Sequence, residues 1–253
     1  LVRNRRSIML YIFGDSFSIP QNHMNEVFGP HGTTVTYIPL EKTWTTIVKE
    51  SILGDSEYVN DSVLGCSNDY IYYKLVERES SFKEGDFVII QPTSMHREWF
   101  FENKPYMAIQ LATMITPGVD VTEEQYQAIE MYKRHLYFEG RNIIHYNMFF
   151  DSLVHKVKMY GEHKIRCLIL PGFDNVPGVK GNLCEASGTE FHNEKTAIAY
   201  YDKTGDLRFN HFSEVNHKIL ADKIIEFFKT GKTVDLTIGF KTGIYTKETL
   251  KTC

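Results

Sequence analysis

The stretch IMLYIFGDSFSIP, residues 8 to 20, indicates the fold class most strongly, because it runs an apolar segment directly into a glycine-led turn. A short, continuous apolar run is typical of a strand that is buried on both faces of a parallel sheet. Gly14-Asp15-Ser16 follows this run, and the loops after the carboxyl ends of parallel strands carry the binding and catalytic residues of α/β proteins. The stretch therefore predicts a buried parallel strand with a serine exposed at its end.

The rest of the chain alternates between strand and helix patterns. The further predicted strands are residues 33–38, 86–91, 165–170 and 196–201. The segments with helical periodicity are residues 122–138, 143–161 and 213–231. The last of these has Ser213 as a predicted N-cap and Gly231 as a predicted stop. This alternation predicts an α/β protein, a three-layer α/β/α sandwich with a mainly parallel sheet of about five strands, as in flavodoxin-like folds.

Composition and charge exclude several classes of protein. A chain of 253 residues with 42% hydrophobic and 24% charged residues is ordinary for one sizeable globular domain. A formal net charge of −4 argues against nucleic acid as a partner. The basic N-terminus precedes an apolar run of only about six residues without a small-residue cleavage site, so it does not predict a signal peptide. No run approaches the roughly 20 apolar residues that span a bilayer, which predicts a soluble, cytoplasmic protein without a membrane partner.

The cysteines predict neither a metal site nor a disulfide framework. Cys66, Cys167, Cys184 and Cys253 form no C-x-x-C pair and have no metal-ligand spacing. Reduced, structural thiols are the simplest interpretation.

At the first turn the chain resembles a known family. An apolar strand followed by Gly-Asp-Ser-Phe-Ser near the N-terminus is similar to the first block of the SGNH hydrolases, also called the GDSL esterase/lipase family. The resemblance implies that Ser16 is a nucleophile and that its backbone N–H contributes to an oxyanion hole. The chain holds a second copy of the tripeptide, Gly54-Asp55-Ser56, but no strong strand precedes it. We therefore expect the second copy to be a loop.

Two further windows carry the oxyanion part of the resemblance. VNDSVLGCSNDYIYYKL, residues 59 to 75, resembles the second family block, in which Gly65 matches the glycine that donates its backbone N–H to the oxyanion. Asn68 is a candidate cap for the helix that follows. The third block departs from the family, because DFVIIQPTSMHREWF places Thr93 or Ser94 where the family has an asparagine.

The third block still suggests candidate site residues. A hydroxyl can donate one hydrogen bond, so we expect Thr93 to be the third oxyanion donor. His96 and Arg97 follow it, and we expect them at the mouth of the site, where a guanidinium could bind an anionic or sugar-like group. A solvated loop is the alternative for this pair.

A segment near the end of the chain resembles the part of the family that carries the catalytic base. DLRFNHFSEVNHKILADKI, residues 206 to 224, resembles the family ending in which a histidine precedes the last helix. By this register His211 is the base, His217 packs or caps inside the helix, and His192 is a fallback. The family spacing is Asp-x-x-His, but the residue three before His211 is Arg208. Asp206 then completes a Ser-His-Asp triad only if extra loop residues allow it, and a Ser-His dyad is the alternative.

The resemblance implies a serine ester hydrolase that needs no cofactor and no metal. We expect a short-acyl esterase or a carbohydrate O-deacetylase, because sugar rings stack on aromatic side chains, of which the chain has 17 Phe and 15 Tyr. A catalytically impaired carbohydrate-binding or structural module of the same fold is the alternative. A nucleotide-binding protein is less well supported, because no Gly-x-Gly-x-x-Gly sequence follows a strand. The predicted hydrolase domain covers residues 1–231, and residues 232–253 are a C-terminal extension, a β-ribbon or partner-binding segment through which copies of the chain could associate.

Overall fold

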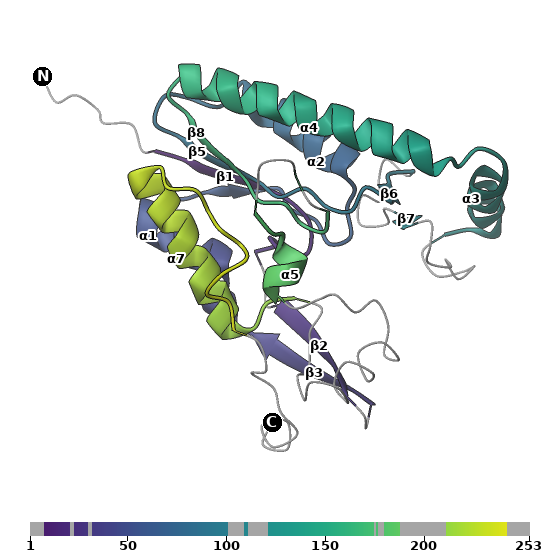
Figure 1. Ribbon diagram of the computed structural model, residues 1–253, viewed down its shortest axis with the longest axis horizontal. Coiled ribbons are helices and arrows are strands. Elements are labelled where there is room, and N and C mark those ends of the chain that lie inside the picture. The colour runs from purple at the N-terminus through teal and green to yellow at the C-terminus, as the bar shows by residue number, and fades with distance from the viewer. Residues whose placement is uncertain are drawn as a thin grey trace, which may run out of the picture.

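Strand β1 (Leu10–Phe13) lies inside a four-stranded parallel sheet in the computed structural model of the chain (Figure 1). The structure describes residues 8–20, 23–29, 32–100, 109–110, 121–174, 176, 180–187 and 211–241. The sheet order is β4 (Val59–Asn60), β1, β5 (Phe87–Ile90) and β8 (Arg166–Ile169). Each neighbouring pair is parallel. The predicted α/β class with a mainly parallel sheet is confirmed.

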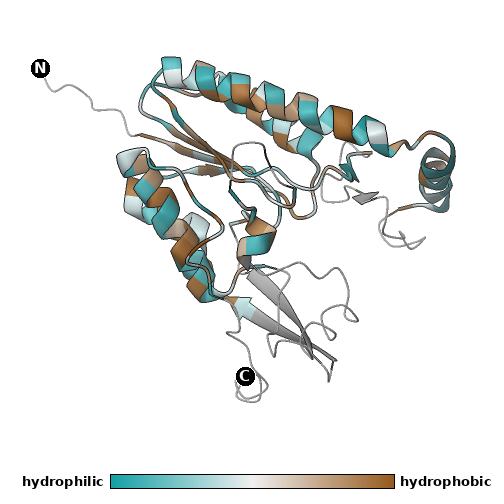
Figure 2. Ribbon diagram, viewed as in Figure 1, coloured by the Kyte–Doolittle hydropathy of each residue, from teal (hydrophilic) through white to brown (hydrophobic). Residues whose placement is uncertain are grey.

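The strands divide their side chains between two cores, because successive residues of a strand point to opposite faces. Leu10 and Ile12 belong to one buried cluster, while Tyr11 and Phe13 belong to the other. Helices α1 (Trp44–Leu53) and α7 (Glu214–Thr230) cover the first face, and α2 (Asn68–Glu79) and α4 (Glu139–Glu162) cover the second. The strands are mostly apolar and lie between two layers of helices in which hydrophilic and hydrophobic residues alternate (Figure 2), which gives the predicted three layers.

The helix boundaries follow from their caps. Ser213 accepts a hydrogen bond from the Asn216 N–H at the start of α7, and Gly231 ends this helix with a left-handed φ of 75°. Thr122 and Gln125 form a capping box at the start of α3 (Glu123–His135). The cap of α2 is Ser67 and not Asn68, which is the first helical residue. No helix in the described part of the chain combines the length and the apolar composition that a bilayer span requires.

One predicted strand lies elsewhere than expected. Residues 33–38 fall in β3 (Gly32–Ile38), which pairs antiparallel with β2 (His23–Gly29) in a separate hairpin, so their assignment to the main sheet was wrong. Only Thr34 to Tyr37 within TTVTYI alternate between polar and apolar residues, but such alternation is more typical of an antiparallel strand than of a buried parallel one. The fourth strand of the sheet is instead β4, and the predicted strand at 196–201 lies outside the described residues.

Four short elements complete the description. They are the 3-10 helix η1 (Leu40–Lys42), the antiparallel pair β6 (Arg97–Glu98) and β7 (Ile109–Gln110), and the helix α5 (Leu183–Ser187).

The described part of the predicted C-terminal extension packs against α7. Residues 232–241 contain no strand, and Val234 and Leu236 are buried in the same core as α7. Asn216 donates its side-chain N–H to the Lys241 carbonyl at 3.0 Å and accepts the Lys241 N–H at 2.8 Å. Residues 242–253 lie outside the described part, so the predicted ribbon stays a prediction there.

The connectivity places a topological switch point beside β1. After β1 the chain forms β4 on one side of it and then crosses to β5 on the other side. The strand order therefore reverses at β1 and β5. In open α/β sheets, ligands bind outside the carboxyl ends of the strands at this point.

Candidate functional site

The turn after β1 holds Ser16 at the reversal point of the sheet. The Asp15 side chain accepts the Phe17 N–H at 3.0 Å, and the Asp15 carbonyl accepts the Ser18 N–H at 2.9 Å. These bonds make Asp15 a structural turn residue. Ser16 is buried, at 6% exposure, so the prediction of an exposed serine was wrong: the turn folds this side chain inward. Its hydroxyl makes no hydrogen bond to another described residue.

Gln91, which no sequence motif indicated, joins the turn after β1 to the loop after β5. It directly follows β5 and is fully buried. Its Oε1 accepts the Asp15 N–H and the Ser18 hydroxyl, each at 3.0 Å, and its Nε2 donates to the Pro92 carbonyl at 2.8 Å. A polar residue at the end of the apolar run DFVIIQ was the available signal, because a buried amide must find hydrogen-bond partners.

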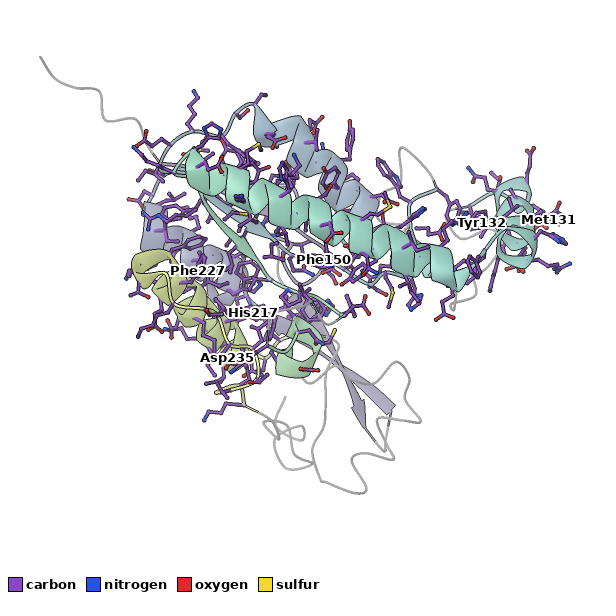
Figure 3. The ribbon with its side chains drawn as sticks, turned by 45° about the horizontal axis from the view of Figure 1, so that its top comes forward. Met131, Tyr132, Phe150, His217, Phe227 and Asp235 are labelled. Carbon is purple, nitrogen blue, oxygen red and sulfur yellow. The ribbon has the colours of Figure 1, made fainter. Side chains whose placement is uncertain are left out.

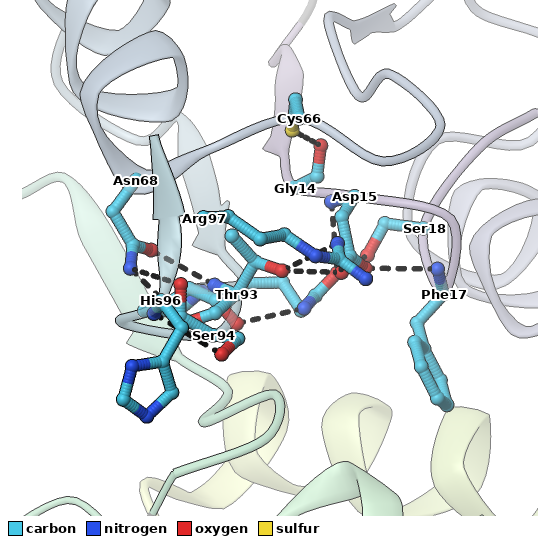
Figure 4. Close-up of polar contacts among 12 residues, drawn as sticks. Gly14, Asp15, Phe17, Ser18, Cys66, Asn68, Thr93, Ser94, His96 and Arg97 are labelled. Atoms are coloured by element: carbon cyan, nitrogen blue, oxygen red, sulfur yellow. Dashed lines mark hydrogen bonds and ion pairs between the residues drawn. The ribbon is translucent and has the colours of Figure 1, made fainter. Parts of the chain in front are cut away.

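A buried polar network fixes the Asp15 carboxylate (Figure 4). The Thr93 hydroxyl donates to Asp15 Oδ2 at 2.7 Å, and Arg97 Nη1 donates to the same oxygen at 2.9 Å. Arg97 Nη1 also donates to Thr93 Oγ1 at 2.7 Å. The Asp15 side chain is 0% exposed and that of Arg97 is 15% exposed, so the ion pair compensates a charge that burial would otherwise penalise strongly.

The network engages the side chains of Thr93 and Arg97, for which the sequence suggested roles in substrate binding and oxyanion stabilisation. The single Thr93 proton is directed at Asp15, so this hydroxyl reaches an oxyanion only by giving up that bond. The Arg97 guanidinium lies against Asp15 and over the Phe173 ring at 4.8 Å. The His96 ring points away from Asp15 in Figure 4, and only its backbone N–H joins the loop, by donating to Ser94 Oγ at 3.2 Å. The predicted functional roles of Thr93, His96 and Arg97 stay predictions.

Gly65 lies in a segment that is hydrogen-bonded to Gly14, the residue after β1. The Val63 N–H donates to the Gly14 carbonyl at 3.0 Å, and Cys66 Sγ donates to the same carbonyl at 3.3 Å. Burial, and after it the Asp15 carboxylate, raises the pKa of the Cys66 thiol, so the thiol stays protonated as a donor. Gly65 has a φ of 66°, a left-handed conformation that glycine adopts without strain. The structure thus brings Gly65 near the turn that holds Ser16.

The loop before α7 reaches the same end of the sheet. The His211 ring lies 5.0 Å from the Phe17 ring, and Phe17 directly follows Ser16 in the chain. His217 is fully buried, and its Nδ1 accepts the Trp44 N–H at 3.2 Å at the start of α1. The predicted packing or capping role of His217 is therefore confirmed. Asp206 and His192 lie outside the described residues.

We expect Thr93→Val to destabilise the fold by about 2 kcal/mol, because valine keeps the shape but removes a buried hydrogen bond to a carboxylate. The free energy of unfolding in urea measures this effect. Thr230→Val is the matched control, since the Thr230 hydroxyl donates to the Glu226 carbonyl at an exposed position. Its expected effect is below about 0.5 kcal/mol. An effect of Thr93→Val as small as that of Thr230→Val would show that the Thr93 hydroxyl does not stabilise the fold.

The described residues offer no metal site, since no three His, Cys, Asp or Glu side chains gather among them. The cysteines that the structure describes, Cys66, Cys167 and Cys184, are free thiols. No protein-family model matches the chain, and no curated protein is significantly similar to it.

Proposed function

We propose that the chain is a serine ester hydrolase of the SGNH type, a short-acyl esterase or a carbohydrate O-deacetylase, with Ser16 as nucleophile and His211 as base. The observation that carries the proposal is the meeting of two distant segments. The turn after β1 and the loop before α7 come together at the reversal point of the sheet, where the His211 ring packs on the residue next to Ser16. Nucleophile and base must share one site for this chemistry.

The proposed reaction is acyl transfer in two steps. His211 takes the Ser16 proton while Ser16 Oγ attacks the ester carbonyl, and the carbonyl electron pair moves to its oxygen. The backbone N–H groups of Ser16 and Gly65 stabilise this oxyanion. The oxyanion then collapses, the C–O bond to the alcohol breaks, and His211 gives its proton to the leaving oxygen.

Water completes the cycle. His211 removes a proton from a water molecule, whose oxygen attacks the acyl-enzyme. The carboxylic acid leaves, and the proton returns to Ser16. Asp206 is the proposed orienting carboxylate, and a His211 held by other groups is the dyad alternative.

The alternative is a binding module that has kept the fold without catalysis. One observation favours it: the Thr93 hydroxyl, which stands where the family has an asparagine donor, is committed to Asp15. Loss of one oxyanion donor typically lowers turnover by about 10²–10³-fold.

Labelling with a fluorophosphonate probe separates the two candidates. We expect covalent modification of Ser16, identified by mass spectrometry of the peptide that contains residues 8 to 20. The label should disappear in His211→Asn, because the unassisted serine hydroxyl is a weak nucleophile. An unlabelled Ser16 in a folded chain would reject the hydrolase and favour the binding module.

A further inference from the structure

A pocket of about 290 Å³ lies beside the buried network, between the start of α2, strand β6 and the first half of α4. Arg97 lines this pocket and also holds Asp15, the residue before Ser16. The pocket is therefore connected through one side chain to the turn of the proposed nucleophile. Its volume is at the small end for ligand sites, which suits a ligand with a single ring.

Two buried polar groups on α4 line this pocket without partners. Asn142 is 4% exposed and Tyr146 is 9% exposed. Neither the Asn142 side-chain N–H group nor the Tyr146 hydroxyl has a hydrogen-bond partner among the described residues. The two residues are four positions apart, so they lie on the same face of the helix. Buried donors without partners are costly to a fold, and two of them on one cavity indicate that a ligand satisfies them.

A third polar group adds an acceptor. Glu98 Oε2 accepts the Tyr132 hydroxyl at 2.6 Å, while Glu98 Oε1 has no hydrogen-bond partner among the described residues and lies 3.8 Å from Arg141. Figure 3 shows Tyr132 on the side of α3 toward the body of the protein, with Met131 on the outer side. The Arg141 guanidinium stacks over the Tyr132 ring at 5.3 Å. The pocket thus presents donors, an acceptor and aromatic surface together.

The charges of the lining select the class of ligand. Asp69 and Glu98 are acidic, while Arg97 and Arg141 are basic, so their formal charges cancel. An anion would meet the two carboxylates, and a cation would meet the two guanidinium groups. Burial, and after it the Asp174 carboxylate, raises the pKa of Tyr146, so this hydroxyl remains a neutral donor. A neutral ligand with several hydroxyl groups satisfies donors and acceptors alike.

We propose that this pocket binds one neutral sugar ring, with hydroxyl groups bonded to Asn142, Tyr146 and Glu98. The assignment of the sugar as the alcohol part of the ester substrate rests on the proposed function, whereas the binding itself does not. Sugar rings also have apolar faces that pack on aromatic side chains, which Phe149 and Tyr132 provide here.

The test is a titration of the full chain, as wild type and as Ser16→Ala, with the methyl glycosides of glucose, galactose, mannose and N-acetylglucosamine. Chemical-shift changes in NMR spectra give the Kd. We expect at least one glycoside to bind both proteins equally with a Kd of about 1 mM. Inorganic phosphate, titrated in parallel, should not bind.

Matched tyrosine variants on α4 locate the site. Tyr146→Phe and Asn142→Leu should each weaken glycoside binding about tenfold, the effect of one lost hydrogen bond. Because the Tyr146 hydroxyl has no partner to lose, the Tm of Tyr146→Phe should not fall. Tyr160→Phe is the control, since the Tyr160 hydroxyl donates to Glu79 Oε1 at 2.9 Å. Its Tm should fall while its Kd stays unchanged.

Three results would overturn the proposal: no glycoside binds, phosphate binds in their place, or binding is unaffected by both Tyr146→Phe and Asn142→Leu. Glycoside binding by a chain that resists fluorophosphonate would keep the sugar site and reject the hydrolase. Labelling of Ser16 without glycoside binding would keep the hydrolase and reject the sugar site.

Discussion

Ser16→Ala is expected to lower the rate of p-nitrophenyl acetate hydrolysis by at least about 10³-fold, the scale on which serine hydrolases lose activity without their nucleophile. Ser18, the nearest other hydroxyl in the turn, cannot replace Ser16, because it is fully buried and donates to Gln91 Oε1. Release of p-nitrophenolate, followed by its absorbance, measures the rate.

The second Gly-Asp-Ser tripeptide supplies the control for this loss. Gly54 is the C-cap of α1, with a φ of 63°, and the Ser56 N–H donates to the Leu53 carbonyl in the turn that follows. This second copy forms the turn that ends α1, in agreement with the predicted loop. Ser56→Ala should therefore keep the wild-type rate. A Ser16→Ala protein that hydrolyses the ester as fast as the wild type would remove the proposed function.

The sheet was predictable where its strands are continuous apolar runs. IMLYIF, DFVIIQ and IRCLIL became three of the four parallel strands. The inner strands β1 and β5 are buried at every position, which requires continuous apolar residues, whereas the outer strand β8 begins at the exposed Arg166. Strand β4 has only two residues, Val59 and Asn60, which is too short for any periodicity. Its place beside β1 comes from tertiary pairing, so no local pattern could have indicated it.

The candidate site was predictable only in part, because some of its contacts also arise from tertiary structure. The family-like turn and the loop before the last helix located Ser16 and His211 at one end of the sheet, because each follows or precedes a recognisable element. The bonds from Thr93 and Arg97 to Asp15 join residues 78 and 82 positions apart. Such contacts depend on how the turn after β1 and the loop after β5 are placed relative to each other. The spacing of residues along the chain does not determine this placement.

Gly172→Ala is expected to have the largest effect on stability, because a Cβ at this position would lie 2.1 Å from the Pro92 carbonyl oxygen. That oxygen belongs to the backbone, so a side-chain rotation cannot relieve the contact. The same Cβ would lie 2.7 Å from Gln91 Nε2, which holds the loop through its bond to Pro92. We expect a loss on the order of 4 kcal/mol, above the usual range for overpacked positions.

Gly161→Ala is the matched control, because a Cβ there meets nothing within 4 Å. Gly161 lies inside α4, where alanine should raise stability by about 0.5–1 kcal/mol through the lower entropy of the unfolded chain. Unfolding in urea, followed by circular dichroism, compares the two variants. If Gly172→Ala were as stable as the wild type, the loop after β8 could not be packed on the loop after β5, next to the turn in which Ser16 is proposed to act.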